Sequence, residues 1–228
     1  MKKSIMLAAL LAALVVSVPA SAAVFIDFGT GGAPAGGTIA VSGGNAIGTN
    51  ILVNQMTVNG AGAADGTYFL YGGGTGGGAN GSAVVNFNTN TGLFTVVGGV
   101  CTIAAGDTCN GGAGTLVTAT TLANGTGAVS NLNFSLLTGT NLSMNFLEPD
   151  TKAATLLSAL GIPSNTTFGF ATASFQGFNT AGTGSPYTVN STDINNTGTV
   201  VPEPTSVLLL GSVLFGVTGL IRRRSKKA

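Results

Sequence analysis

The sequence contains no histidine and no tryptophan, and only 7% of its residues are charged. The lack of histidine excludes Ser–His–Asp and Cys–His catalysis, together with any metal site that uses imidazole ligands. The lack of tryptophan removes one aromatic platform for a sugar ring. We therefore expect a protein that is not an enzyme and that holds no cofactor.

Basic residues are nearly absent from the middle of the chain. Between residues 23 and 200, one lysine (Lys152) stands against six acidic residues, a net charge of −5. One cation cannot neutralise a row of phosphates, so we expect no nucleic-acid partner, and binding to an anionic membrane surface is equally disfavoured. Asn, Thr, Ser and Gly take the place of charged residues, which predicts a neutral polar surface.

The chain has two cysteines, Cys101 and Cys109. Seven residues separate them, and Gly106-Asp107 between them is a turn signal. In an oxidising compartment such a pair forms a disulfide that closes a loop or hairpin, which is the expected state of these two cysteines. No second cysteine pair completes a metal site, and no bound metal is expected.

The N-terminus has the features of a signal peptide. Lys2-Lys3 precedes an uncharged apolar stretch over residues 5–18, and Ala20 and Ala22 follow as a small-x-small cleavage box. An apolar stretch of this length is too short to span a bilayer comfortably. We expect signal peptidase to remove residues 1–22, with a cut one residue later as the alternative.

The C-terminus carries a second apolar run, over residues 207–221. At 1.5 Å per residue it covers roughly 22 Å, against a hydrocarbon core of about 30 Å, so its length is marginal for a membrane helix. Five basic residues follow, which can reach the headgroups and stay cytoplasmic: Arg222, Arg223, Arg224, Lys226 and Lys227. We expect a transmembrane helix here, with the preceding chain exported.

Residues 201–228 contain three features in order: Pro202-Glu203-Pro204, an expected short apolar helix and a basic cluster. This segment resembles the PEP-CTERM sorting signal of Gram-negative bacteria that make exopolysaccharide. The resemblance implies that the membrane enzyme exosortase cuts at or near these prolines. It implies transient residence in the inner membrane, then delivery to the cell surface or extracellular matrix. It covers only about the last 28 residues, and whether the helix is removed or retained stays open.

Short segments of alternating apolar and polar residues, separated by Gly and Asn, predict β-strands through the middle of the chain. An Asn- and Gly-rich turn over residues 88–92 marks the clearest hairpin, and a change of phase within 167–178 predicts a bulge. We expect an all-β domain over 23–178, built as a β-sandwich or jelly roll, with a β-helix as the alternative. The expected strands are 24–28, 38–41, 51–58, 67–71, 83–87, 93–97, 116–122, 129–137, 142–147, 167–178 and 187–194.

One short helix and one linker complete the predicted domain. Asp150 is expected to cap a helix over residues 151–160, which Gly161 ends. Residues 179–200 are poor in apolar side chains, so we expect a stalk with one edge strand near residues 187–189.

Two sequence features suggest chemistry. Gly72, Gly74 and Gly77 form a GxGxxG pattern, but a strand rather than a helix is expected after it, so we interpret it as a flexible loop. Glu148 and Asp150 are the only close pair of acids. Helix capping is their expected role, with Ca²⁺ ligation and catalysis as alternatives.

These observations favour a non-enzymatic exported protein with a structural or adhesive role. Its expected partners are signal peptidase, exosortase and exopolysaccharide. One alternative is a lectin-like carbohydrate-binding module that presents Tyr68, Tyr71 and Tyr187 to the sugar. Another is an extracellular hydrolase that uses two carboxylates.

Overall fold

The computed structural model describes residues 23–31, 36–72, 82–102, 114–137, 141–179 and 186–200. Ala22–Thr199 form one compact unit. The predicted signal peptide (1–22) and sorting segment (201–228) lie outside the described residues. Within the described ranges, no helix is both long and apolar enough to cross a membrane.

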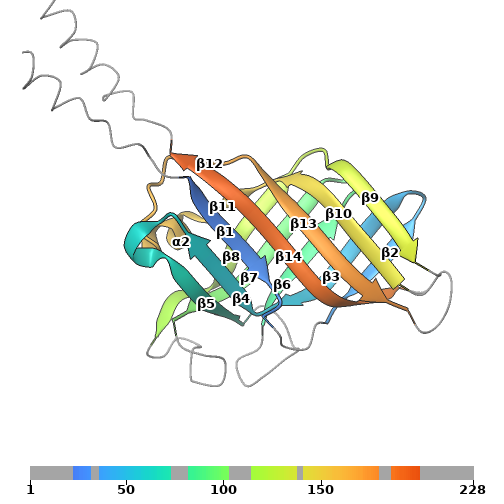
Figure 1. Ribbon diagram of the computed structural model, residues 1–228, viewed down its shortest axis with the longest axis horizontal. Helices are drawn as coiled ribbons and strands as arrows, with labels where there is room; N and C mark the ends of the chain where they lie inside the picture. The colour runs from blue at the N-terminus through green and yellow to red at the C-terminus, as the bar shows by residue number, and fades with distance from the viewer. Residues whose placement is uncertain are drawn as a thin grey trace, which may run out of the picture. The chain divides into compact units, whose positions relative to one another are not determined.

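All the strands of this unit belong to one antiparallel sheet, which confirms the all-β class (Figure 1). The strands are β1 Val24–Gly29, β2 Thr38–Ser42, β3 Asn45–Val53, β4 Gln55–Asn59, β5 Gly66–Tyr71, β6 Ala83–Asn88, β7 Leu93–Cys101, β8 Thr115–Thr126, β9 Ser130–Leu137, β10 Asn141–Pro149, β11 Thr151–Lys152, β12 Thr166–Phe168, β13 Phe170–Phe178 and β14 Tyr187–Val200. A single turn of 3₁₀ helix, η1 Gly62–Ala64, and one α-helix, α2 Ala154–Ala159, lie between strands.

Most strands pair with their neighbours in the chain. β2 pairs with β3, β4 with β5, β6 with β7, and β7 with β8. In the second half, β9 pairs with β10 and β13 with β14. These hairpins are joined by pairings between strands that are not consecutive, since β1 pairs with β4, β3 with β6, β5 with β7 and β10 with β13. The clearest predicted hairpin is confirmed: Asn88 pairs with Leu93, and Gly92 has a φ of 68°.

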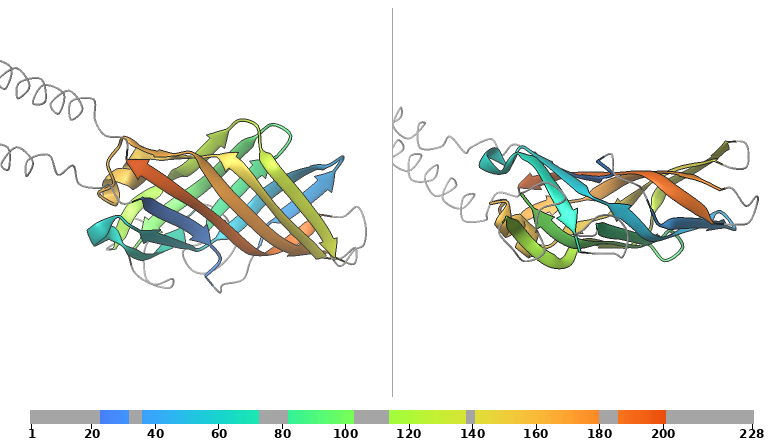
Figure 2. Two further views of the ribbon diagram at one scale, coloured as in Figure 1. Left: turned by 45° about the horizontal axis from the view of Figure 1, so that its top comes forward. Right: turned by 90° about the horizontal axis from the view of Figure 1, so that it is seen from below.

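The last strand, β14, pairs with the first strand of the sheet as well as with its neighbour in sequence. It pairs with β13 and also with β1, where Val24 lies opposite Gly198. The first and last strands, blue and orange-red, therefore lie side by side (Figures 1 and 2). The chain enters and leaves the sheet at the same end.

The predicted stalk is wrong over residues 187–200. These residues are β14, and Thr192, Ile194 and Asn196 are buried on its inner side. The low apolar content of this segment predicts a stalk, but several inward positions of the strand carry Thr, Asn or Gly instead of apolar residues. Backbone pairing on both edges of the strand supplies the stabilisation that side chains alone do not.

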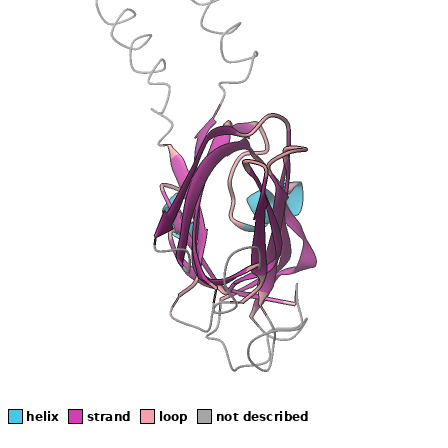
Figure 3. Cartoon of the chain, turned by 90° about the vertical axis from the view of Figure 1, so that its right-hand side faces the viewer, coloured by secondary structure: helices cyan, strands magenta, loops and turns pink. Residues whose placement is uncertain are grey.

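The sheet curves so that its halves face each other across a common interior (Figure 3). Inward and outward residues alternate along β1, where Ile26 and Phe28 are fully buried. The rings of Phe87, Phe146 and Phe175 pack together with centroids 4.8–5.9 Å apart. Burial of these apolar side chains is the main stabilising contribution to the fold.

The segment after β10 differs from its prediction. Thr151–Lys152 form β11, which pairs with Ala123 and Asn124 of β8, and the helix begins only at Ala154. The residue before the helix is Ala153, and no side chain caps the helix. The prediction that Asp150 caps the helix is therefore wrong. Strand alternation continues past Pro149 and turns Asp150 toward the interior.

Two long predicted strands are interrupted. Residues 51–58 divide at Asn54 into the end of β3 and most of β4, and 167–178 divide at Gly169 into β12 and β13. Inward positions change from Thr166 and Phe168 to Ala171 and Ala173. This confirms the predicted change of phase.

Candidate functional site

Two acidic side chains meet on the outer face of the sheet. Asp27 of β1 and Asp193 of β14 sit on neighbouring strands and point away from the core, because their flanking residues point inward. Their side chains hydrogen-bond to each other. The Asn195 amide donates a further hydrogen bond to Asp193 Oδ1 at 3.4 Å.

The pair has unusual proton affinity. Partial burial, together with the hydrogen bond and the charge of Asp193, raises the pKa of Asp27 to about 7. Two carboxyl groups in contact cannot both ionise readily, so the pair keeps one proton until the pH rises to about 7. The residues opposite Asp27 on the adjacent strands are Thr57 and Asn195, and Ser174 lies opposite Asp193. None of these three carries a charge.

A cavity of about 230 Å³ opens beside this pair. Its polar side chains are those of Asp27, Thr30, Gln55, Thr57, Ser191 and Asp193. Hydroxyl, amide and carboxyl groups of this kind can hydrogen-bond a small polar ligand. The acids are in hydrogen-bond contact, closer than the roughly 5 Å or more that separates the two carboxyls of a glycosidase. This pair therefore does not support a glycosidase site.

A second polar cluster lies inside the domain. Along β10 and β11 the inward row runs through Leu142, Met144 and Phe146, and then continues as Glu148, Asp150 and Lys152. The last three are 1%, 3% and 5% exposed. One inward row thus changes from apolar to ionisable within the core.

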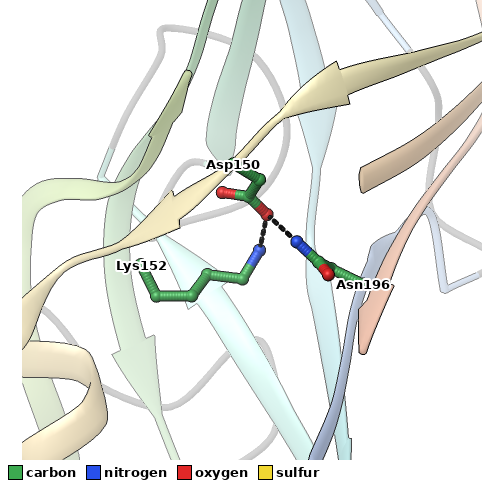
Figure 4. A network of polar contacts seen from close by, with 3 residues as sticks. All are labelled: Asp150, Lys152 and Asn196. Carbon is green, nitrogen blue, oxygen red and sulfur yellow. Dashed lines mark hydrogen bonds and ion pairs between the residues drawn. The ribbon is translucent and has the colours of Figure 1, made fainter. Parts of the chain in front are cut away.

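The contacts in this cluster converge on one oxygen atom. Lys152 Nζ forms an ion pair with Asp150 Oδ2. Asn196 of β14 donates its Nδ2 hydrogen to the same Oδ2 at 2.8 Å, as Figure 4 shows. The Phe28 and Phe168 rings lie 4.9 and 5.5 Å from Lys152 Nζ. The amine is therefore held between one carboxylate and two aromatic rings.

Burial dominates the electrostatics of this interior cluster. Burial and the Asp150 charge, opposed by Lys152, raise the pKa of Glu148 to about 10, so Glu148 is a neutral acid at pH 7. Burial lowers the pKa of Lys152, against the opposing effect of Asp150 and Glu148. Both Glu148 oxygens and Asn196 Oδ1 are buried without a hydrogen-bond partner in the described structure.

The acid pair predicted from sequence thus lies in a different place from the one expected. Glu148 and Asp150 are buried in the core rather than exposed at a helix terminus. Asp150 Oδ2 is engaged by Lys152 and Asn196, while Asp150 Oδ1 has no hydrogen-bond partner among the described residues. Among the described residues, no group of three or more His, Cys, Asp or Glu side chains is arranged to hold a metal ion.

The expected tyrosine platform is not formed. Tyr71 and Tyr187 are 2% and 7% exposed. The Tyr71 hydroxyl donates to the Val117 carbonyl oxygen at 3.1 Å. Tyr68 is partly buried, and its hydroxyl donates to the Ala64 carbonyl oxygen at 2.8 Å. The prediction that these three side chains are exposed to a sugar is wrong.

Cys101 ends β7, is fully buried and is disulfide-bonded. Its expected partner, Cys109, lies outside the described residues, as do Gly74 and Gly77 of the glycine-rich loop. The segment after that loop is strand β6, not a helix. The remaining predicted processing residues also lie outside: Ala20, Ala22, Pro202, Glu203, Pro204, Arg222, Arg223, Arg224, Lys226 and Lys227.

Sequence reasoning missed Asp27, Asp193, Lys152 and Asn196. Lys152 did carry a signal, because it is the one basic residue between 23 and 200 and shares the parity of Glu148 and Asp150. Continuing the strand to residue 152 would have placed all three inward. Asp27 and Asp193 are brought together only by the β1–β14 pairing, which no local pattern reveals.

Comparisons of this chain with protein-family models, with curated proteins and with solved structures found no match.

Proposed function

We propose that this chain is the precursor of an exported surface or extracellular-matrix protein with a structural or adhesive role, which an exosortase sorts through residues 201–228. The observation that carries this proposal is the ordered C-terminal sequence: Pro202-Glu203-Pro204, an apolar run and a basic cluster. The prolines keep the chain extended and bar a helix from starting earlier, so a membrane enzyme can bind this segment.

The boundaries of the folded unit support this proposal. β1 begins at Val24, directly after the expected signal-peptide cut, and β14 ends at Val200, directly before the sorting motif. Removal of both end segments would leave the sheet complete. In architecture we propose a sandwich-like domain, whose layers are the two facing halves of one sheet.

The test is processing of a motif variant in an exopolysaccharide-producing Gram-negative host that has an exosortase. Replacement of Pro202, Glu203 and Pro204 by Ala should leave an uncleaved precursor in the inner membrane, as an immunoblot of fractionated cells would reveal. Pro163→Ala, an exposed proline far from the motif, is the matched control and should be processed as the wild type. Normal processing of the triple variant would overturn the proposal.

A carbohydrate-binding role is the second candidate, and the polar cavity beside Asp27 and Asp193 favours it. Saturable binding of purified exopolysaccharide is expected. Gln55→Ala with Ser191→Ala should weaken it roughly 10-fold or more, since each lost hydrogen bond is worth about 1 kcal/mol. Thr197→Ala, exposed on β14 outside the cavity, should bind as the wild type. Non-saturable binding, or equal affinities of the double variant and the wild type, would contradict the carbohydrate-binding role and favour the structural one.

A further inference from the structure

An amine, a carboxylate and a carboxamide meet inside the domain. Lys152 on β11 and Asn196 on β14 both contact Asp150 Oδ2 (Figure 4). Lys152 and Asn196 lie more than forty positions apart in sequence. All three residues are at most 5% exposed, so water has little access to them.

The environment favours a reactive amine. A lysine in water is protonated and hydrated, and it does not attack an amide. Here the Phe28 and Phe168 rings flank Nζ, and burial lowers the pKa of Lys152. The neutral amine, which is the nucleophilic form, is therefore more accessible than in water. Asp150, in contact with Nζ, is a ready acceptor for the lysine's proton.

The carboxamide is equally well placed. Its nitrogen donates to Asp150 Oδ2, while its oxygen has no hydrogen-bond partner among the described residues. Glu148, two residues before Asp150 on the inward row, is neutral at pH 7 and has no partner for its own carboxyl group.

We propose that Lys152 and Asn196 join through a spontaneous isopeptide bond, with Asp150 as the proton carrier between them. The Nζ lone pair attacks Cγ of Asn196, so that the Nζ–Cγ bond forms and the Cγ–Nδ2 bond breaks. Asp150 Oδ2 accepts the ammonium proton of Nζ and passes it to Nδ2, which leaves as ammonia. A second Nζ proton then moves to Asp150, which ends as a neutral acid. No electrons are exchanged with an outside reagent, so the step needs no oxidant and no cofactor.

Fixed geometry and the exclusion of water favour formation of the isopeptide bond. Holding the two reactants on one oxygen converts a bimolecular reaction into an intramolecular one, and exclusion of water prevents hydrolysis. The bond ties β14 to β11, close to the end at which the chain leaves the sheet. It goes beyond the proposed sorting and adhesive role and does not depend on either.

The sequence offers a direct test. Lys152 is the one trypsin site between Lys3 and Arg222, and trypsin does not cut after an acylated lysine. The full-length chain is purified in detergent, denatured, reduced and treated with trypsin. We expect the wild type to stay uncut at Lys152 and its intact mass to be lower by one ammonia. Lys152→Arg and Asn196→Ala should each give two fragments that meet at residue 152, with no loss of ammonia.

Two further variants keep the test decisive. Asn195→Ala changes the same residue type at the adjacent position, which points away from the core, and should stay uncut. Asp150→Ala, shown by circular dichroism to retain β-structure, should be cut at Lys152. Cleavage of the wild type at Lys152 with an unreduced mass would overturn the proposal. Loss of water instead of ammonia, with Asn196→Ala uncut, would assign the bond to Asp150 and overturn the role of Asn196.

Discussion

The Asp27 side chain hydrogen-bonds to that of Asp193 across the first and last strands of the folded unit. This contact lies on the outer face, where the strands β1 and β14 pair with each other. The same β14 strand carries Asn196 on its inner face, against Asp150. One strand therefore belongs to both polar clusters, and its pairing decides whether either forms.

Asp27→Asn should make stability less dependent on pH. The folded pKa of Asp27 is about 7 against an ordinary value of 3.8, so the folded state keeps a proton that the unfolded state releases between these values. The stability from this group is complete below about pH 4 and is lost as the pH rises through 7. The introduced amide can still donate to Asp193, but it does not titrate.

The measurement is Tm against pH for the wild type and this variant. Above pH 7.5 the variant should melt higher by roughly 2–4 °C, the shift that about 1 kcal/mol produces in a domain of this size. Below pH 4 it should gain nothing. Solvent screening at this half-exposed site keeps the expected effect modest. A constant difference in Tm between pH 4 and pH 8 would contradict the shared proton.

Glu148→Gln should stabilise the protein in alkaline solution. The folded pKa of Glu148 is about 10 against an ordinary 4.5, so this group lowers stability progressively as the pH rises from 4.5 to 10. Gln has the same shape, stays neutral and keeps a hydrogen-bond donor. Urea denaturation should show that the variant is more stable than the wild type by a larger margin at pH 9 than at pH 6. An equal gain at both pH values would mean that Glu148 does not bind its proton more tightly in the folded state.

Ile194→Ala should destabilise the domain strongly, because Ile194 is fully buried in the middle of β14. Truncation of such a core side chain costs about 2–5 kcal/mol. Thr197→Ala, exposed on the same strand, is the control and should change the free energy of unfolding by less than about 0.5 kcal/mol. Both are read from urea denaturation curves. A negligible effect of Ile194→Ala would indicate that residues 187–200 form a stalk and not a packed strand of the sheet.

Replacement of Cys101 and Cys109 together by Ser should lower the free energy of unfolding by about 2–3 kcal/mol, the value of a short loop in the chain-entropy model. Cys101 is disulfide-bonded at the buried end of β7, so its bridge constrains the unfolded chain. Dithiothreitol should destabilise the wild type by a similar amount and leave the double variant unchanged. If the wild type is unfolded in dithiothreitol and its free energy of unfolding does not change, the disulfide does not stabilise the domain.

Local patterns were enough to predict most strands. Alternation predicts β1, β2, β5, β6, β9 and β10 within one or two residues at each end, and the 88–92 turn follows from residues that tolerate positive φ. Partner strands were not predictable, because backbone hydrogen bonds between distant segments leave no mark on either segment alone. The strand order, and with it the Asp27–Asp193 contact, therefore emerged only from the structure.

The misplaced features share one cause. Asp150 followed by an alanine- and leucine-rich stretch has the pattern of a capped helix, and residues 187–200 have the composition of a linker. In both places tertiary burial overrides local preference: β14 is paired on both edges, and Lys152 is drawn inward to meet Asp150 and the two Phe rings. Sequence rules that place charged residues outside fail here because Lys152 and Asp150 pair with each other inside the core.

The central claim is that the mature protein is the folded sheet freed from both terminal segments. The intact mass of the protein recovered from the cell surface or matrix tests it most directly, because each end contributes a known mass. The account predicts a chain that begins at Ala23 and ends at or near Pro202-Glu203-Pro204. A surface protein whose mass still includes residues 205–228 would contradict it.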